Sequence, residues 1–426
     1  MKRAIVVGSG AGGATVAKEL QGAFDVTVLE AGGEFRPLGF GLRTVERLKR
    51  LGLVRDERQI RWFMPTMRTR RAADGMVLVN GVGLGGTTTV ATGNGVRVDR
   101  DLQALGIDLD PEFESAHREI PIGTAHQQRW RQSTRDLFDV CGEMGLTPTP
   151  MPKMGDAERC VRCGRCVLGC RPGAKWDSRR YLRVAVDNGA RVVSGCKVER
   201  LIIEAGRARG VVAWRGWRRQ FYAADLVVLA AGGFGTPPIL HASGIPTEPR
   251  LFVDPVLCVA SEWPGAAQCH EIAMPFVVQR DGYIISPYFD YLSFLFNPAW
   301  RYPARDILPL MIKLADTESG DIEGSRVSKR LAERDQSKLT AGVRLCTEIL
   351  GRLGVPEKAV FLGTVNAGHP GGTLPLTCRS AASFHDERLP ANVFVADASL
   401  FPRSLGNPPI LTIVAMAKRV SSICRA

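Results

Sequence analysis

The chain has 426 residues, a length that predicts two or three folded domains. Of these residues 45% are hydrophobic and 23% charged, a composition that excludes an intrinsically disordered protein. Its formal net charge is +13, from basic residues spread along the chain. No recognition motif for nucleic acid accompanies this charge. A solvated basic face or an acidic protein partner explains it better, and we expect no nucleic acid to bind.

The sequence predicts a cytoplasmic protein without a transmembrane segment. The first apolar stretch begins at residue 4, which leaves no space for a signal peptide before it. The longest apolar run near the C-terminus, 410–417, is far too short to cross a bilayer. Eleven cysteines in a chain without an export signal are not expected to form a disulfide framework.

The first 31 residues follow the order of elements that a dinucleotide site requires. An apolar strand (4–7) runs into glycines in G-x-G-x-x-G spacing (8–13), and a helix-compatible segment (14–20) follows. A second apolar strand (26–29) ends in an acidic residue, Glu30. The pattern predicts a strand, a tight turn, a helix and a strand that together bind a dinucleotide.

Each residue of this motif has a physical reason. Gly8 lets the chain turn sharply, Gly10 lets a pyrophosphate approach the backbone, and Gly13 lets the helix pack close to the sheet. The free N–H groups at the start of the helix attract phosphate. Glu30 can accept hydrogen bonds from an adenosine ribose, and its charge repels a 2′-phosphate. The alternative is a glycine-rich turn in some other α/β protein.

A second glycine-rich stretch, 77–95, indicates positive φ angles or a close backbone approach. It is either a glycine-rich hairpin or a loop that lies along an extended cofactor. Hydrophobic periodicity and turn residues predict the remaining elements. Helices are expected at 42–53, 101–145, 181–188, 335–353 and 407–423, strands at 191–193, 198–204, 210–214, 225–230 and 392–396, a linker at 151–158, and an antiparallel sheet within 250–300.

Four cysteines form the most specific metal-binding pattern in the chain. Cys160, Cys163, Cys166 and Cys170 have C-x₂-C-x₂-C-x₃-C spacing, the spacing of bacterial ferredoxins, with one residue inserted before the following proline. Structural zinc sites usually use two C-x₂-C pairs separated by a long spacer. We therefore predict an iron–sulfur cluster, with zinc and free thiols as the alternatives.

The spacing alone does not identify the fourth ligand of such a cluster. In two-cluster ferredoxins the last cysteine of the run binds the other cluster, and this chain has only one run. Either Cys170 or another cysteine closes the site. The seven other cysteines are expected to be small buried apolar residues; they are Cys141, Cys196, Cys258, Cys269, Cys346, Cys378 and Cys424.

Seven stretches together resemble one flavoprotein family, the glucose–methanol–choline (GMC) oxidoreductases. They run in family order from end to end, and the last is the strongest. They are GSGAGG (8–13), LEAGG (29–33), GVGLGGTTTVATGNG (81–95), 169–175, LVVLAAGGFGTPPILHASGI (226–245), AGHPGG (367–372) and VFVADASLFPRSLGNPPILTIVAMAKR (393–419). The chain is short for the family, and it has four cysteines where most members have only the last.

The resemblance implies an α/β fold. It combines a Rossmann-like FAD-binding domain, of the GMC and p-hydroxybenzoate-hydroxylase type, with a smaller α+β substrate domain that contains an antiparallel sheet, plus an iron–sulfur loop. The expected boundaries are 1–35, 75–100, 180–248 and 385–426 for the FAD-binding domain, 101–150 and 249–384 for the substrate domain, and 151–179 for the iron–sulfur segment.

The resemblance also implies FAD as cofactor and a catalytic pair, His369 and Asn407. Members near cholesterol oxidase carry similar His-Pro-x-Gly-Gly and Asn-Pro motifs. The cofactor contacts that it implies are Gly8, Gly10, Ala11, Gly13, Glu30, Ala31, Gly85, Gly86, Thr87, Asn94, Val198, Ala231, Asp397, Ala398, Asn407 and Pro408.

The chemistry explains why these two residue types are needed. Oxidation of an alcohol moves a hydride to flavin N5 while the hydroxyl loses its proton. A neutral imidazole at His369 can accept that proton, and Asn407 can hydrogen-bond the same hydroxyl. The simpler alternatives are a loop histidine without a role and an asparagine that caps the last helix.

Three functional hypotheses follow. The first is an FAD and [4Fe–4S] dehydrogenase of an alcohol or polyol that passes electrons to an acidic carrier protein such as a ferredoxin. The second reverses the flow, so that a ferredoxin drives flavin reduction of a C=O or C=C bond. The third is a zinc-stabilised flavin-binding subunit without its own substrate, against which the intact pair of His369 and Asn407 argues.

Overall fold

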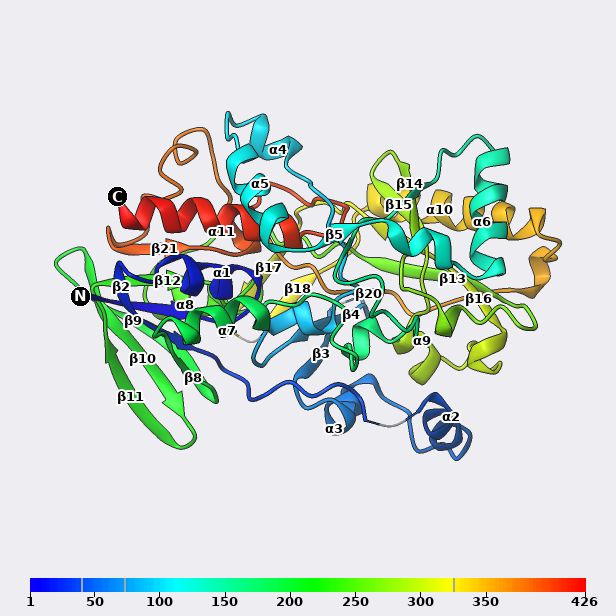
Figure 1. Cartoon of the computed structure of the whole chain (residues 1–426), viewed down its shortest axis with the longest axis horizontal. Helices are drawn as coiled ribbons and strands as arrows, with labels where there is room; N and C mark the ends of the chain where they lie inside the picture. The colour runs from blue at the N-terminus through cyan, green and yellow to red at the C-terminus, as the bar shows by residue number, and fades with distance from the viewer. Residues whose placement is uncertain (40, 73, 325) are drawn as a thin grey trace.

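The computed structural model describes residues 1–39, 41–72, 74–324 and 326–426. The molecule is elongated, with both termini at one end beside a parallel sheet and a large mixed sheet towards the other end (Figure 1). The first part holds the nucleotide motif, and the cysteine segment lies between the two sheets (Figure 1).

The parallel sheet has the order β21-β12-β1-β2-β8. Its strands are β21 (Val393–Val395), β12 (Leu226–Leu229), β1 (Lys2–Val7), β2 (Phe24–Leu29) and β8 (Arg191–Val193), and all four pairings are parallel. The central strands are short apolar runs whose inner residues are fully buried, as parallel strands covered on both faces require. Every one of these strands was predicted from the sequence.

Helices α1 (Ala11–Glu19), α5 (Asp110–Glu119), α7 (Arg179–Asp187) and α11 (Ile410–Arg425) pack together beside this sheet. A three-stranded antiparallel sheet of β9 (Cys196–Glu204), β10 (Arg207–Arg215) and β11 (Arg218–Ala223) also contacts it. Strand β11 was not predicted from the sequence, because its residues RRQFYA are exposed or half-buried and carry no apolar run.

The mixed sheet has the order β3-β4-β20-β13-β16-β15-β14-β6, with β19 also paired to β13. Its pairings are antiparallel except that between β4 and β20. Helix α10 (Glu333–Arg352) packs on β13, β15 and β16. The strands are β3 (Met67–Arg71), β4 (Val77–Gly81), β20 (Asn366–Ala367), β13 (Val256–Glu262), β16 (Ile307–Leu314), β15 (Tyr283–Pro287), β14 (Phe276–Arg280), β6 (Thr149–Pro150) and β19 (Val360–Leu362).

The remaining elements are short. They are α2 (Leu42–Arg50), α3 (Ile60–Phe63), α4 (Arg100–Gln103), α6 (Gln132–Glu143), α8 (Thr236–Ala242), α9 (Tyr291–Phe296), β5 (Ile122–Gly123), β7 (Lys153–Met154), β17 (Gly320–Glu323) and β18 (Arg326–Lys329). In the described parts of the chain, no helix has the length and apolar character needed to span a bilayer.

Three predictions about elements were wrong in detail. The stretch 250–300 contains α9 as well as strands, because the Asp290 side chain accepts from Leu292 N–H and starts a helix there. The predicted linker 151–158 contains β7, which pairs with β5. The last helix begins at Ile410 with Pro409 as N-cap, so Asn407 does not cap it. The division into domains remains a prediction; helix α5, from the segment 101–150, shares the core of the parallel sheet.

Candidate functional site

The glycine turn after β1 is shaped by close backbone contacts. Gly8 has a φ of +98°, and a Cβ there would lie 2.4 Å from the Ala230 carbonyl oxygen. A Cβ on Gly13 would lie 2.0 Å from the Gly8 oxygen, which explains why helix α1 needs glycine at this point. At Gly10, by contrast, a Cβ would meet no heavy atom within 4 Å. The open space in front of Gly10 and the start of α1 fits a pyrophosphate.

Glu30 stands at the end of β2, beside this turn, with only 5% of its surface exposed. Its carboxylate accepts hydrogen bonds from Ser9 N at 3.0 Å, Ser9 Oγ at 2.6 Å and Gly32 N at 2.9 Å. Burial raises the pKa of Glu30, and these donors oppose the rise. These hydrogen bonds fix the Glu30 carboxylate at the end of β2, the position from which dinucleotide-binding folds contact the ribose.

The second glycine-rich stretch lies against the first. A Cβ on Gly86 would be 2.8 Å from Gly10 Cα, and the Ser178 hydroxyl is within 3.0 Å of the carbonyls of both Ser9 and Gly85. Thr87 Oγ1 accepts from Gly81 N–H. The stretch is a strand followed by a tight helical turn rather than a hairpin. This geometry supports the interpretation as a cofactor loop.

The ends of β12 and β21 complete the same edge of the sheet. Asp397 is buried, and its carboxylate accepts from Gly232 N at 2.9 Å, Thr236 Oγ1 at 2.5 Å and Ser399 N at 2.9 Å. The structure therefore gathers most of the predicted cofactor residues at the carboxyl ends of the parallel strands, where such folds bind nucleotides, and in the loop after β4 that lies against them. They are Gly8, Gly10, Ala11, Gly13, Glu30, Ala31, Gly85, Gly86, Thr87, Ala231, Asp397 and Ala398.

Three other residues that were predicted to contact the cofactor are instead described by their contacts or burial within the protein. Asn94 accepts from Lys153 Nζ, and its amide donates to Met274 Sδ at 3.0 Å. Val198 is a buried residue within β9. Pro408 is buried just before the last helix.

His369 lies in a loop that crosses the carboxyl ends of β12 and β21. Gly372 N donates to the Ala398 carbonyl at 3.1 Å, and a Cβ on Gly233 would lie 2.1 Å from the Pro370 oxygen. The side chain of His369 keeps 28% of its surface exposed, while its Nδ1 is buried. Burial, aided by the charge of Lys313, lowers the pKa of His369 below its ordinary value. This shift favours the neutral imidazole.

Beneath His369 lies a buried polar network that the sequence analysis missed. Asp254 Oδ2 is 3.5 Å from His369 Nδ1 and also accepts from Lys313 Nζ, while Ser404 Oγ donates to the other oxygen. A second buried pair, Asp316 and Lys329 at 2.7 Å, lies next to it. A lysine inside the apolar strand ILPLMIKL was the one signal in the sequence, since buried lysines need partners.

Asn407 is not joined to His369 by any hydrogen bond in the described parts of the chain. Its amide pairs with the amide of Gln279, with Gln279 Nε2 donating to Asn407 Oδ1 at 3.0 Å and the reciprocal contact at 3.4 Å. The side chain is half-buried at the end of the segment that leads into α11. Its predicted role at the substrate hydroxyl remains a prediction.

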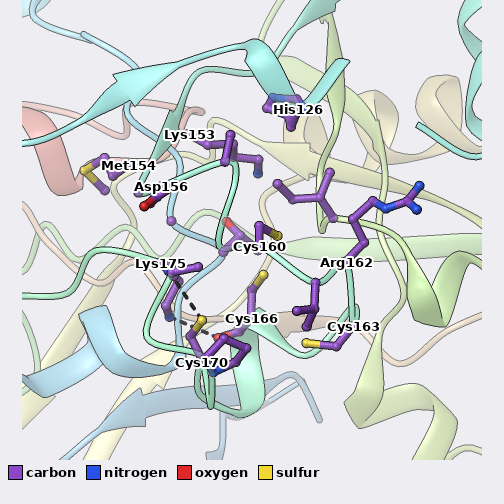
Figure 2. A pocket seen from close by; sticks show the side chains of 18 of the residues that line it. His126, Lys153, Met154, Asp156, Cys160, Arg162, Cys163, Cys166, Cys170 and Lys175 are labelled. Atoms are coloured by element: carbon purple, nitrogen blue, oxygen red, sulfur yellow. Dashed lines mark hydrogen bonds between the residues drawn. The ribbon is translucent and has the colours of Figure 1, made fainter. Parts of the chain in front are cut away.

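All four cysteines of the run line one cavity of about 240 Å³ (Figure 2). Lys175 N–H donates to Cys170 Sγ at 3.3 Å, and burial raises the pKa of Cys160 and Cys163. The thiols are free, and among the described residues no three His, Cys, Asp or Glu side chains converge as a single metal ion would need. The iron–sulfur cluster thus remains a prediction.

Two buried lysines connect this cavity to the glycine-rich loop, and the sequence analysis did not single them out. Lys175 Nζ donates to the carbonyls of Thr88, Thr89, Ala91 and Cys166 at 2.7–3.0 Å. Lys153 Nζ donates to Asn94 Oδ1 and to the Ala273 carbonyl. Burial lowers the pKa of Lys153 to about 7.

The prediction that all seven other cysteines are buried was wrong for two. Cys378 is exposed and Cys424 is half-buried, whereas Cys141, Cys196, Cys258, Cys269 and Cys346 are buried. Cys378 lies in a turn at the surface that follows a proline-containing loop, so its side chain does not reach the hydrophobic core.

Comparison with known proteins agrees with this architecture. The family model described as GMC oxidoreductase matches residues 3–258. The chain belongs to the GMC oxidoreductase family. A GMC-type oxidoreductase of uncharacterised function from Mycobacterium tuberculosis is 30% identical over 98% of this chain and 75% of its own length. A long-chain-alcohol oxidase from Arabidopsis thaliana is 25% identical over 98% of this chain and 66% of its own length.

Among solved structures, pyridoxine 4-oxidase from Mesorbium loti superposes with a TM-score of 0.71 and 16% identity, covering 99% of both chains. This likeness shows the fold. These comparisons confirm the predicted GMC family, the mixed α/β fold and the FAD-binding architecture. The dinucleotide expected in this fold is therefore FAD.

Proposed function

We propose that this GMC oxidoreductase is a dehydrogenase that oxidises a CH–OH group with FAD, with His369 as the proton acceptor. One observation carries the proposal: Gly372 of the His369 loop donates to the Ala398 carbonyl just after β21, which places the imidazole at the sheet edge that holds the dinucleotide motif. Burial lowers the pKa of His369, which favours the neutral form that a base requires. The similarity to a long-chain-alcohol oxidase supports an alcohol as the substrate class.

Bound FAD would supply the acceptor for a hydride from the carbinol carbon. This chain's own residues do the rest. The start of α1 and the open space at Gly10 would hold the phosphates, and Glu30 the ribose. His369 would take the hydroxyl proton as the C–H bond breaks, which is a general-base role for a neutral imidazole. Asn407 would orient the hydroxyl after leaving its pairing with Gln279.

We further propose that Cys160, Cys163, Cys166 and Cys170 hold a [4Fe–4S] cluster that carries electrons away singly. The cavity that all four line supports Cys170 as the fourth ligand. A zinc ion needs all its sulfurs within bonding distance of one point, and the described side chains do not converge in this way. In a cubane each thiolate binds a different iron, so the four sulfurs surround a larger group and need not lie within bonding distance of one point.

An acidic carrier protein would accept these electrons at the rim of the cavity. Arg159 and Arg171 are exposed next to Cys160 and Cys170, which line the cavity, and the lining residue Val161 is 63% exposed. A basic rim around an apolar residue is complementary to a carrier with an acidic face, and such complementarity mainly raises the association rate. The proposed setting is cytoplasmic, and neither a nucleic acid nor a membrane partner is part of the proposal.

Anaerobic stopped-flow spectra of the purified protein with a panel of primary and secondary alcohols test the enzyme proposal. We expect one alcohol class to bleach the flavin, and His369→Ala to slow that step by ~10²–10⁴-fold. If reduced ferredoxin reduces the flavin and no alcohol does, the flow is reversed. If neither does, the chain is a subunit without its own substrate.

The carrier proposal has a matched control within the chain. Arg159→Glu with Arg171→Glu should slow electron transfer to an acidic ferredoxin and weaken its dependence on salt. Arg215→Glu with Arg218→Glu, which changes the same charge on the exposed β10–β11 turn, should leave this transfer unchanged. Equal effects of the two pairs would exclude the rim as the docking surface.

A further inference from the structure

We propose that Asp254 is a positioning residue for His369: it accepts a hydrogen bond from Nδ1–H and so leaves Nε2 as the atom that takes the substrate proton. This inference rests on the proposed role of His369 and extends it to a residue that the family resemblance did not indicate.

The geometry at Nδ1 leaves one candidate partner. His369 Nδ1 is buried and has no close hydrogen-bond partner, and Asp254 Oδ2 stands 3.5 Å from it. Catalytic hydrogen bonds are often long before substrate binds. An ionised carboxylate can only accept, so the proton of a neutral imidazole facing it must be on Nδ1. Nε2 then keeps its lone pair.

Asp254 stays ionised because of a buried cation. Burial opposes ionisation, but the Lys313 ammonium, with a side chain only 2% exposed, outweighs it and lowers the pKa of Asp254. Ser404 Oγ donates to the second oxygen. Both carboxylate oxygens are therefore occupied on the protein side, and the direction of Oδ2 towards His369 is fixed.

The backbone of Asp254 is held just as firmly. Its φ is +51°, a conformation that is uncommon for residues other than glycine. Asp316 accepts from the N–H groups of Val253 and Asp254 at 2.8–3.2 Å and is itself paired with the fully buried Lys329. A turn held in this way keeps the carboxylate aimed at the His369 loop, whose own N–H donates to the Val253 carbonyl at 3.3 Å.

A simpler explanation is that Asp254 only neutralises Lys313. The two explanations differ in the pH profile. The Asp254 charge raises the pKa of His369, while burial and Lys313 lower it. Removing the Asp254 charge should lower this pKa further and move the acidic limb of the rate profile to lower pH. A purely structural role would change stability and leave the profile in place.

The test uses Asp254→Asn in the flavin-loaded protein. We expect the limiting rate of flavin reduction to fall about 10–100-fold with little change in KM, by analogy with the carboxylate partners that orient metal-bound histidines. The acidic limb should move down. Independently of activity, ¹⁵N-histidine NMR on the six histidines should show an Nδ1–H tautomer at His369, and loss of that tautomer in the variant. His369→Asn assigns the signal.

Glu57→Gln is the matched control, because Glu57 is also a buried carboxylate, paired with Arg71 outside this network. It should change neither the tautomer nor the profile. If Asp254→Asn does not fold, Asp254→Asn with Lys313→Met removes both buried charges and is measured in the same way. An unchanged tautomer and profile would overturn the inference. Unaltered flavin reduction in His369→Ala would instead overturn the proposed function.

Discussion

The Lys175 ammonium donates to the backbone carbonyl of Cys166 at 3.0 Å, and the same ammonium binds three carbonyls of the glycine-rich loop. One buried cation therefore holds the cysteine segment against the loop that lies on the dinucleotide turn. The two proposed redox centres are linked through this side chain, which makes its replacement informative about both.

Lys175→Met should destabilise this junction. Four buried carbonyls lose their donor, and hydrogen bonds to charged groups are typically worth ~1.5–3 kcal/mol each before relaxation. Three N–H donors serve these four carbonyls and the variant no longer buries a charge, so we expect the free energy of unfolding to fall by on the order of 3 kcal/mol, less than the sum of the four bonds. Flavin and iron content should fall with it. Differential scanning fluorimetry and cofactor analysis measure this. A variant with wild-type melting temperature and full cofactor content would contradict the link.

Cys163→Ser should separate the two cofactors. We expect about four iron atoms and four sulfides per wild-type chain, and loss of them in the variant, with flavin retained because the nucleotide turn is another part of the structure. Substrate should still bleach the flavin once without oxygen, but electrons should not reach a carrier protein. Elemental analysis that finds zinc and no iron would refute the cluster.

Gly10→Ala and Gly12→Ala form a matched pair. The Cβ at Gly10 would meet no protein atom within 4 Å, so the fold should tolerate it while the affinity for FAD falls. The Cβ at Gly12 would lie 1.6 Å from the Ala396 oxygen, so this variant should lose stability even without cofactor. Thermal melting of the flavin-free proteins and FAD titration distinguish the two effects. Equal melting temperatures for both variants would contradict the packing described here.

The pH dependence of flavin reduction should follow His369. Its pKa is lowered by burial, and the neutral form is the base. The rate should therefore be flat at pH values above about 6.5, the ordinary pKa of histidine, and should fall only as the pH drops below that value and protonates the ring. Stopped-flow rates of flavin reduction between pH 5 and 8 measure this acidic part of the pH profile. A fall that begins above pH 7 would show that another group limits the step.

The sequence predicted the nucleotide-binding sheet well because its signals are local. The order from strand β1 through Gly8 to Glu30 is continuous in the chain, and each predicted strand of that sheet is present. The environment of His369 could not be predicted in the same way. Asp254, Lys313 and Ser404 come from distant segments and have no spacing that marks them. The pairing of Asn407 with Gln279 likewise depends on how a loop meets an edge of the mixed sheet.

The edge strand β21 has a consequence for biosynthesis. Strands β1 and β2 lie within the first 29 residues, yet their sheet is complete only when residues 393–395 pair with β12 and α11 packs on α1. At 5–20 residues per second, translation separates these events by roughly 20–80 s. Once β12 (Leu226–Leu229) has been synthesised, its edge stays unpaired and open to other strands until residues 393–395 follow, roughly 8–33 s later at the same rate. Cofactor capture is therefore expected late, after the last segment has left the ribosome.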